Sequence, residues 1–199
     1  MFNDNQQTFF PVYYHLNGDA YQSWCNTRAG FYSLTASPYL WLDGSYDAGS
    51  TYAEWANDLV IEELAPTDVT ISINAFRDGG HLDIRASVCI ETGGTGKDMR
   101  IYFVQVLDHY PDDETYYRNA FRQVTTTDIN VAANGCVDVS ASMSLKADDL
   151  AKLEDVGILV WAQEPLNSGP ADTYQASFVF NPPGIMADGF ESGDVTAWD

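Results

Sequence analysis

The chain from residue 68 onward alternates between apolar and polar positions with a period of two. The alternation is clearest in three segments, which are 69–75, 82–90 and 137–145. Such a pattern predicts β-strands with one face on a core and the other face in water. Residues 101–107 are apolar at both parities, which is typical of a central strand covered on two sides. Two further apolar segments, 156–162 and 174–180, complete the set.

Turn residues such as Asp78-Gly79-Gly80 separate these segments. Six or seven short strands joined in this way predict an immunoglobulin-like antiparallel β-sandwich over residues 66–182. The segment 110–127 is expected to be an irregular connection, and 148–154 a short helical turn.

Residues 1–65 are rich in aromatic side chains and follow no strict alternation. Thr51 and Glu54 form a capping box of the form T-x-x-E, which predicts a helix over residues 52–64. Pro66 ends that helix, so we place a first domain boundary after residue 65.

A second boundary falls at Pro182-Pro183-Gly184. We expect residues 183–199 to form a separate acidic-aromatic C-terminal tail, whose composition is also that of a disordered chain end.

The charge of the chain narrows the range of partners. The formal net charge is −20, and the nine basic residues are scattered along the sequence. A chain of this kind is not expected to bind nucleic acid or anionic membranes. No apolar run approaches 18 residues, so no membrane span is expected. The acidity is typical of proteins that stay soluble in an extracellular or salty medium.

Two of the three cysteines are expected to form a disulfide. Cys89 lies near the end of one predicted strand and Cys136 at the start of another, and both share the parity of polar neighbours. If the two strands pair antiparallel, the thiols meet on the solvent face at a Cα separation of roughly 5.5 Å. The predicted Cys89–Cys136 disulfide fits an extracellular or cell-envelope location, whereas two free thiols are the alternative.

A calcium loop is the one metal site that the sequence offers. Asp43, Ser45, Asp47 and Glu54 stand at oxygen-ligand positions of a calcium-loop template. The glycine needed at the sixth position is Ala48, and Glu54 is already explained by helix capping. Calcium therefore stays an alternative, and we expect no other cofactor.

Other catalytic and metal patterns are absent from the sequence. His15, His81 and His109 lack the spacing of a zinc site, and there is no G-x-S-x-G motif. The acidic cluster Asp112-Asp113-Glu114 is typical of a solvated loop. We assign no catalytic residue.

Several segments resemble a known family in their order along the chain. They are PVYYHL (11–16), SWCNTRAGFY (23–32), SPYLWLDG (37–44), APTDVTISI (65–73), NAFRQV (119–124) and VGILVWAQ (156–163). The first three resemble the second half of a thioredoxin fold. Together the segments resemble thioredoxin-like bacterial outer-membrane or secreted lipoproteins, in which a thioredoxin domain precedes a β-sandwich.

The resemblance implies particular roles for three features. It makes residues 1–65 a truncated thioredoxin-like α/β segment and places Pro38 at the family's cis-proline. It also makes Cys25 a buried packing thiol rather than a nucleophile. The tail motif DGFESGD-x-x-x-W at residues 188–198 resembles a sorting or processing segment of secreted bacterial proteins. The family's C-x-x-C motif has no counterpart in this sequence, which argues against redox activity.

These features together predict an α+β, non-catalytic secreted or cell-surface protein that acts through protein contacts. A half thioredoxin sheet would leave the strand near residues 9–16 unpaired, so this strand is expected to support homo-oligomers by strand addition. Two alternatives stay open. One is a fragment of a thiol-disulfide oxidoreductase or redox chaperone whose C-x-x-C half lies upstream. The other is a calcium- or carbohydrate-binding module.

Overall fold

The computed structural model describes residues 10–18, 20–35, 38–51, 55, 58–59, 66–110 and 118–184 of the chain. They form a β-rich α+β fold with few helical residues. The N-terminal elements are α1 (Ser23–Phe31), β1 (Leu40–Leu42) and β2 (Tyr46–Gly49). The others are β3 (Val69–Asp78), β4 (His81–Ile90), β5 (Lys97–Leu107), β6 (Ala120–Val131), β7 (Cys136–Ser144), α3 (Ala147–Ala151), the 3-10 turn Leu153–Asp155, β8 (Val156–Gln163) and β9 (Thr173–Phe180).

Seven strands form two antiparallel sheets that face each other. One sheet has the order β3-β4-β7 and the other the order β6-β5-β8-β9. Alternate residues of β4, such as Leu82, Ile84 and Val88, point into the core between the sheets, where they join Phe103 of β5 and Ile158 of β8. The intervening polar residues of β4 face solvent, as the sequence pattern predicts.

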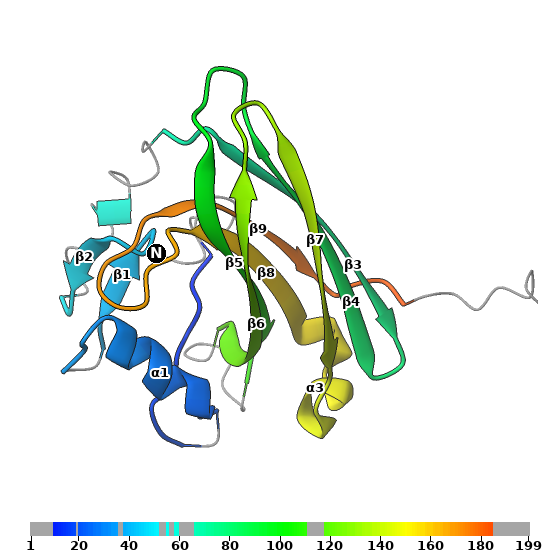
Figure 1. Cartoon of the computed structure of the whole chain (residues 1–199). Coiled ribbons are helices and arrows are strands. Elements are labelled where there is room, and N and C mark those ends of the chain that lie inside the picture. Colours follow the sequence, from blue (N-terminus) through cyan, green and yellow to red (C-terminus); the bar gives the residue numbers. More distant parts are fainter. Residues whose placement is uncertain are drawn as a thin grey trace, which may run out of the picture.

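The four-stranded sheet is apolar on its other face as well. This outer face carries Tyr102, Val104, Val106, Phe121, Leu159 and Trp161. Side chains of α1 and of the segment before it cover these residues, including Val12, Tyr14, Trp24 and Cys25. Figure 1 shows the resulting order of layers, with α1 on one side of β6-β5-β8-β9 and β3-β4-β7 on the other. The N-terminal part of the chain therefore buries a second apolar core.

The prediction of an irregular connection over 110–127 is wrong for its second half, because β6 begins at Ala120. The alternation is hidden there because both faces of the strand are covered. Phe121 packs in the outer core, while Arg122 is buried on the opposite side against Asp149. A register shift between β5 and β6, at Gln105/Val106, disturbs the pattern further.

The expected exposed strand near residues 9–16 is not present in its described part, residues 10–16. Only Tyr13 makes a β-bridge, and it is parallel, to Ala120 of β6. The Tyr13 N–H donates to the Asn119 carbonyl at 3.1 Å, and its carbonyl accepts from the Phe121 N–H at 3.0 Å. The described segment therefore makes one β-bridge with the sandwich of its own chain, and homo-oligomerisation by strand addition stays a prediction.

Residues 38–59, as far as described, form a small apolar cluster beside α1. β1 and β2 pair as an antiparallel hairpin, and Leu42, Ala48 and Trp55 form one buried cluster. Trp55, Asp58 and Leu59 are helical, within the helix expected over 52–64. Ser37 lies outside the described residues, so the cis form of the Ser37–Pro38 bond stays a prediction, as does the thioredoxin-like arrangement.

Candidate functional site

A shallow groove of about 500 Å³ lies where α1, β5, β6 and the loop after β8 meet. It combines aromatic, cationic and hydroxyl side chains. Its lining residues are Trp24, Thr27, Arg28, Phe31, Arg100, Tyr102, Thr126, Thr127, Asp128, Leu166 and Asn167. We call it the α1 groove.

The spacing of residues on α1 explains one wall of the groove. Trp24, Arg28 and Phe31 stand at positions i, i+4 and i+7, so they share one face of the helix. The loop after β8 is held against the end of the helix, because the Gly169 N–H donates to the Phe31 carbonyl at 2.7 Å.

The register of two strands explains the floor. Tyr102 of β5 lies opposite Thr126 of β6, and Arg100 lies opposite Asp128. Residues that face each other across an antiparallel pair share a face of the sheet, so all four side chains project toward α1.

Arg28 is the most unusual residue of the groove. Its side chain is only 7% exposed, yet its hydrogen-bond acceptors are neutral. Nη2 donates to the Tyr32 hydroxyl at 2.7 Å and to Gln163 Oε1 at 3.1 Å, while the buried Nε has no hydrogen-bond partner in the described part of the chain.

Aromatic rings supply most of the surroundings of this guanidinium. Its carbon lies 4.7 to 6.0 Å from the ring centroids of Trp24, Phe31, Tyr32, Tyr102 and Trp161. Each such contact attracts a cation through the electron-rich face of the ring. Burial raises the pKa of Tyr32, so its hydroxyl stays neutral and accepts a hydrogen bond from Arg28 without compensating its charge.

The second arginine of the groove is paired. Arg100 Nε and Nη2 donate to the two carboxylate oxygens of Asp128 at 2.7 and 3.0 Å, and Nη1 donates to the Leu166 carbonyl at 3.0 Å. The hydrogen bond from Arg100 lowers the pKa of Asp128. This bidentate pair holds the loop after β8 in place, and its charges neutralise each other.

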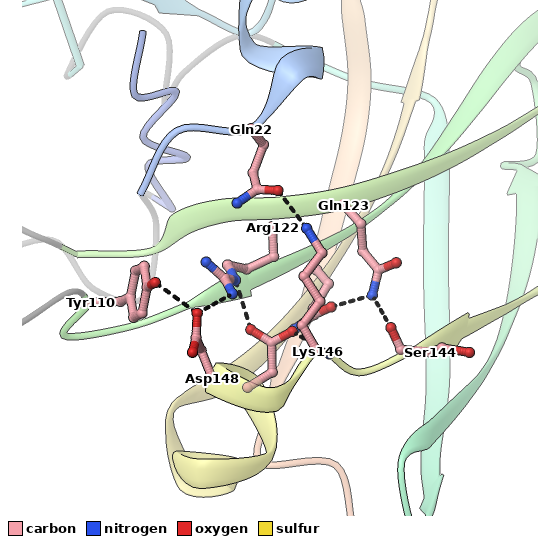
Figure 2. Close-up of polar contacts among 9 residues, drawn as sticks. Gln22, Tyr110, Arg122, Gln123, Ser144, Lys146 and Asp148 are labelled. Carbon is pink, nitrogen blue, oxygen red and sulfur yellow. Dashed lines mark hydrogen bonds and ion pairs between the residues drawn. The ribbon is translucent and has the colours of Figure 1, made fainter. Parts of the chain in front are cut away.

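A second polar cluster joins α1 to the sandwich at the far end of β6 (Figure 2). Arg122 Nε donates to Asp149 Oδ1 at 2.6 Å, and the two side chains are 2% and 0% exposed. Asp149 Oδ2 also accepts the Lys146 backbone N–H at 2.9 Å, at the start of α3. The Lys146 ammonium in turn donates to Gln22, directly before α1. The charge of Arg122 is paired within the chain, although its Nη1 is buried without a hydrogen-bond partner among the described residues, and this pairing fits a structural role.

Cys89 and Cys136 face each other directly in the β4–β7 register and form a disulfide. Their Cα atoms are 4.1 Å apart, closer than expected. A separation of this order is typical of a non-hydrogen-bonded antiparallel pair, in which facing residues approach most closely. Cys25 is the remaining thiol; it is fully buried, and burial raises its pKa.

The calcium-loop residues lie around the β1–β2 hairpin. Asp47 accepts hydrogen bonds from the Tyr39 hydroxyl and the Gly49 N–H, each at 2.9 Å, which explains one carboxylate by local turn structure. Asp43 and Ser45 lie in the turn, and Glu54 falls outside the described residues. Among the described residues, no cluster of three His, Cys, Asp or Glu side chains could hold a metal ion.

The histidines and acidic loop residues do not converge on one site. The His81 ring lies 3.3 Å from the Ser144 hydroxyl as an exposed cross-strand pair, and burial lowers the pKa of His15. His109 lies 3.4 Å from Asp108, and residues 112–114 fall outside the described part. None of the α1 groove residues was singled out from the sequence. The spacing of Trp24 and Arg28 predicts that they share a helix face, but it does not predict which strands complete the groove.

The fold is similar to that of a solved bacterial protein. HBP35 of Porphyromonas gingivalis superposes with a TM-score of 0.66 at 7% sequence identity, over 82% of this chain and 59% of that chain. This chain therefore spans less than two thirds of HBP35, and at that identity the likeness shows the fold alone.

A more distant match is a domain of the outer membrane lipoprotein Omp28 from the same organism. It has a TM-score of 0.42 and 12% identity, over 60% of this chain and 93% of that domain. No family model and no curated protein matches the chain. No helix among the described residues is long and apolar enough to cross a membrane.

Proposed function

We propose that this chain is a non-catalytic binding module of the bacterial cell envelope or its surroundings, and that it acts through contact with another protein. The observation that carries the proposal is the α1 groove. On the side where α1 covers the sandwich, it presents aromatic surface and a cation, Arg28, that has no carboxylate partner among the described residues. A concave site with few titratable groups fits a ligand-binding site better than a catalytic site.

The order of the strands supports a binding role. The order β3-β4-β7 in one sheet and β6-β5-β8-β9 in the other supports an immunoglobulin-like interpretation of the sandwich, with β6 beside β5. Folds of this class carry function on the sites added to them. In this chain the added part is the N-terminal segment that creates the groove.

The cell-envelope location is supported by chemistry. The Cys89–Cys136 disulfide lies on a solvent-facing strand pair and fits an oxidising compartment. The net charge of −20 fits an extracellular medium, and the fold is shared with a bacterial protein. In this proposal residues 1–65 retain the shape of a thioredoxin-like segment without its redox chemistry, since Cys25 is a buried, protonated thiol.

Site-specific photo-crosslinking in living cells tests the proposal. A photoreactive amino acid at Thr126 probes the groove, and one at Thr70 is the matched control, because Thr70 is an exposed threonine on the opposite outer face. We expect a discrete adduct with one protein from position 126 only, in the envelope or medium fraction. The captured protein is then purified and its binding to the chain measured directly. Equal adducts at both positions, or recovery with cytoplasmic markers, would refute the proposal.

A further inference from the structure

We infer that the α1 groove binds a carboxylate carried by a peptide, either an acidic side chain or a free C-terminal carboxylate of a partner protein. The inference rests on the proposed function and names the chemistry that the groove recognises. It follows from the charge of one buried residue and from what surrounds it.

Arg28 differs from the other buried arginine that the structure describes. Both side chains are more than 90% buried, at 7% exposure for Arg28 and 2% for Arg122. Arg122 has a carboxylate at 2.6 Å, in Asp149. The described acceptors of Arg28 are a hydroxyl and an amide oxygen, and its Nε has none.

The missing counter-ion is notable in this chain. There are 29 acidic residues and only nine Lys and Arg. Arg100, Arg118, Arg122 and Lys97 each have an aspartate within 2.7 Å. A buried cation is normally paired because its desolvation is costly, and aromatic faces compensate only part of that cost. Within the described part of the chain Arg28 has no anionic partner, so an anion supplied by another molecule would complete its environment.

The remaining walls indicate which anion fits. Asp128 is already used by Arg100, so the groove offers one uncompensated positive charge, which matches a single carboxylate. The strongly acidic chain would repel a more highly charged group such as a phosphate. Trp24, Phe31 and Leu166 supply apolar contacts for the neighbouring side chains of a peptide, and Thr127 and Asn167 supply hydrogen-bonding groups for its amides.

Peptide binding to the purified full chain tests the inference. The first probe is Ac-Ala-Leu-Glu-Leu-NH2 and the second is Ac-Ala-Leu-Gln-Leu with a free C-terminal carboxylate. The neutral control is Ac-Ala-Leu-Gln-Leu-NH2. Affinity is measured by calorimetry and by the change in the intrinsic tryptophan fluorescence of the chain, to which Trp24 at the groove contributes. We expect at least one carboxylate peptide to bind ten-fold or more tightly than the neutral control, and the two probes distinguish the source of the carboxylate.

Variants of Thr126 locate the binding to the groove without removing a buried group. Thr126 is exposed and faces the same side as Tyr102. Thr126→Glu adds a carboxylate of the chain to the groove that Arg28 lines and should weaken peptide binding ten-fold or more. Thr126→Gln has nearly the same size and no charge, and should leave the affinity within three-fold of wild type.

Arginine variants complete the test. Arg28→Gln should lose at least ten-fold in affinity, whereas Arg85→Gln, which removes an exposed positive charge on β4, should change it less than three-fold. If Arg28→Gln does not fold, the Thr126 pair decides.

Equal binding of the neutral peptide, equal affinities of Thr126→Glu and Thr126→Gln, or no binding of either carboxylate peptide at millimolar concentration would each overturn the inference. An in-cell adduct at position 126 together with any of these results would leave the proposed function standing and show that the groove recognises another feature of its partner.

Discussion

The ion pair between Arg122 and Asp149 should contribute several kcal/mol to folding because its partners cannot be solvated separately. Nε and Oδ1 are 2.6 Å apart, and the side chains are 2% and 0% exposed. Replacing Arg122 with Met leaves a buried carboxylate without its cation. Removal of one partner from a buried pair costs about 3–5 kcal/mol of unfolding free energy.

The corresponding change at Asp149 should cost slightly more. Asp149→Ala removes the partner of Arg122 and also the acceptor for the Lys146 N–H at the start of α3, a hydrogen bond worth about 1 kcal/mol. The double variant Arg122→Met/Asp149→Ala removes both charges of the pair, so neither is left buried without its partner. We therefore expect a coupling energy of about 2 kcal/mol or more, with the double variant more stable than the sum of its single changes implies.

Urea unfolding followed by far-ultraviolet circular dichroism measures these free energies by linear extrapolation. The control is Asp128→Asn, which breaks a pair of nearly equal length with Arg100, at 2.7 Å, whose aspartate is 60% exposed. An exposed pair contributes at most about 1 kcal/mol. If the buried and exposed variants lose the same free energy, or if the double variant is simply additive, burial is not what sets the strength of the pair.

Three further effects should follow from the structure. Replacing both Cys89 and Cys136 with serine should lower the unfolding free energy by about 4 kcal/mol, because the disulfide joins residues 47 apart and so restricts the unfolded chain. In urea unfolding, the reduced wild type should be as stable as this variant. Gly44→Ala should cost at least about 2 kcal/mol, since its φ is +76° and a Cβ would lie 2.3 Å from a facing backbone oxygen. At Gly169, where φ is +84°, an added Cβ would have no atom within 4 Å, so Gly169→Ala should cost only about 1 kcal/mol. The melting temperatures of the two alanine variants test this difference. Burial alone would raise the pKa of Asp108, but hydrogen bonds from a guanidinium and a backbone N–H lower it in the folded state. Its contribution is therefore present above the unfolded pKa of about 4 and is lost as the pH falls below it. Urea midpoints between pH 7 and pH 3 should fall less steeply for Asp108→Asn than for wild type.

The strands could be predicted where one face of the sheet meets solvent. In β4 every second residue is buried and the residues between them are exposed or half-buried, and the same parity places Cys89 opposite Cys136. β6 could not be found in this way, because Phe121 and Arg122 point in opposite directions and both are buried. A period of two carries no signal when both faces of a strand are covered.

The α1 groove depends on contacts between residues far apart in the sequence. The apolar character of residues 101–107 indicated that β5 is covered on two sides, but not which segment covers it. Arg28 and its acceptor Gln163 are separated by 135 positions, so no local pattern connects them. The local pattern predicts only that Trp24 and Arg28 share a face of the helix. The aromatic outer face of the sheet determines where that helix face packs.

The aromatic outer face of the four-stranded sheet also determines what happens if a protease separates the N-terminal segment from the sandwich. Tyr102 and Trp161 stack at 4.8 Å beneath α1, and they would meet water if a protease cut near residue 66 and the N-terminal piece diffused away. The remaining sandwich would then expose the broad apolar face of this sheet to solvent, and it should precipitate or bind detergent. Because these apolar contacts hold the N-terminal piece on the sheet, cleavage near residue 66 should leave two fragments that stay associated until denaturant is added.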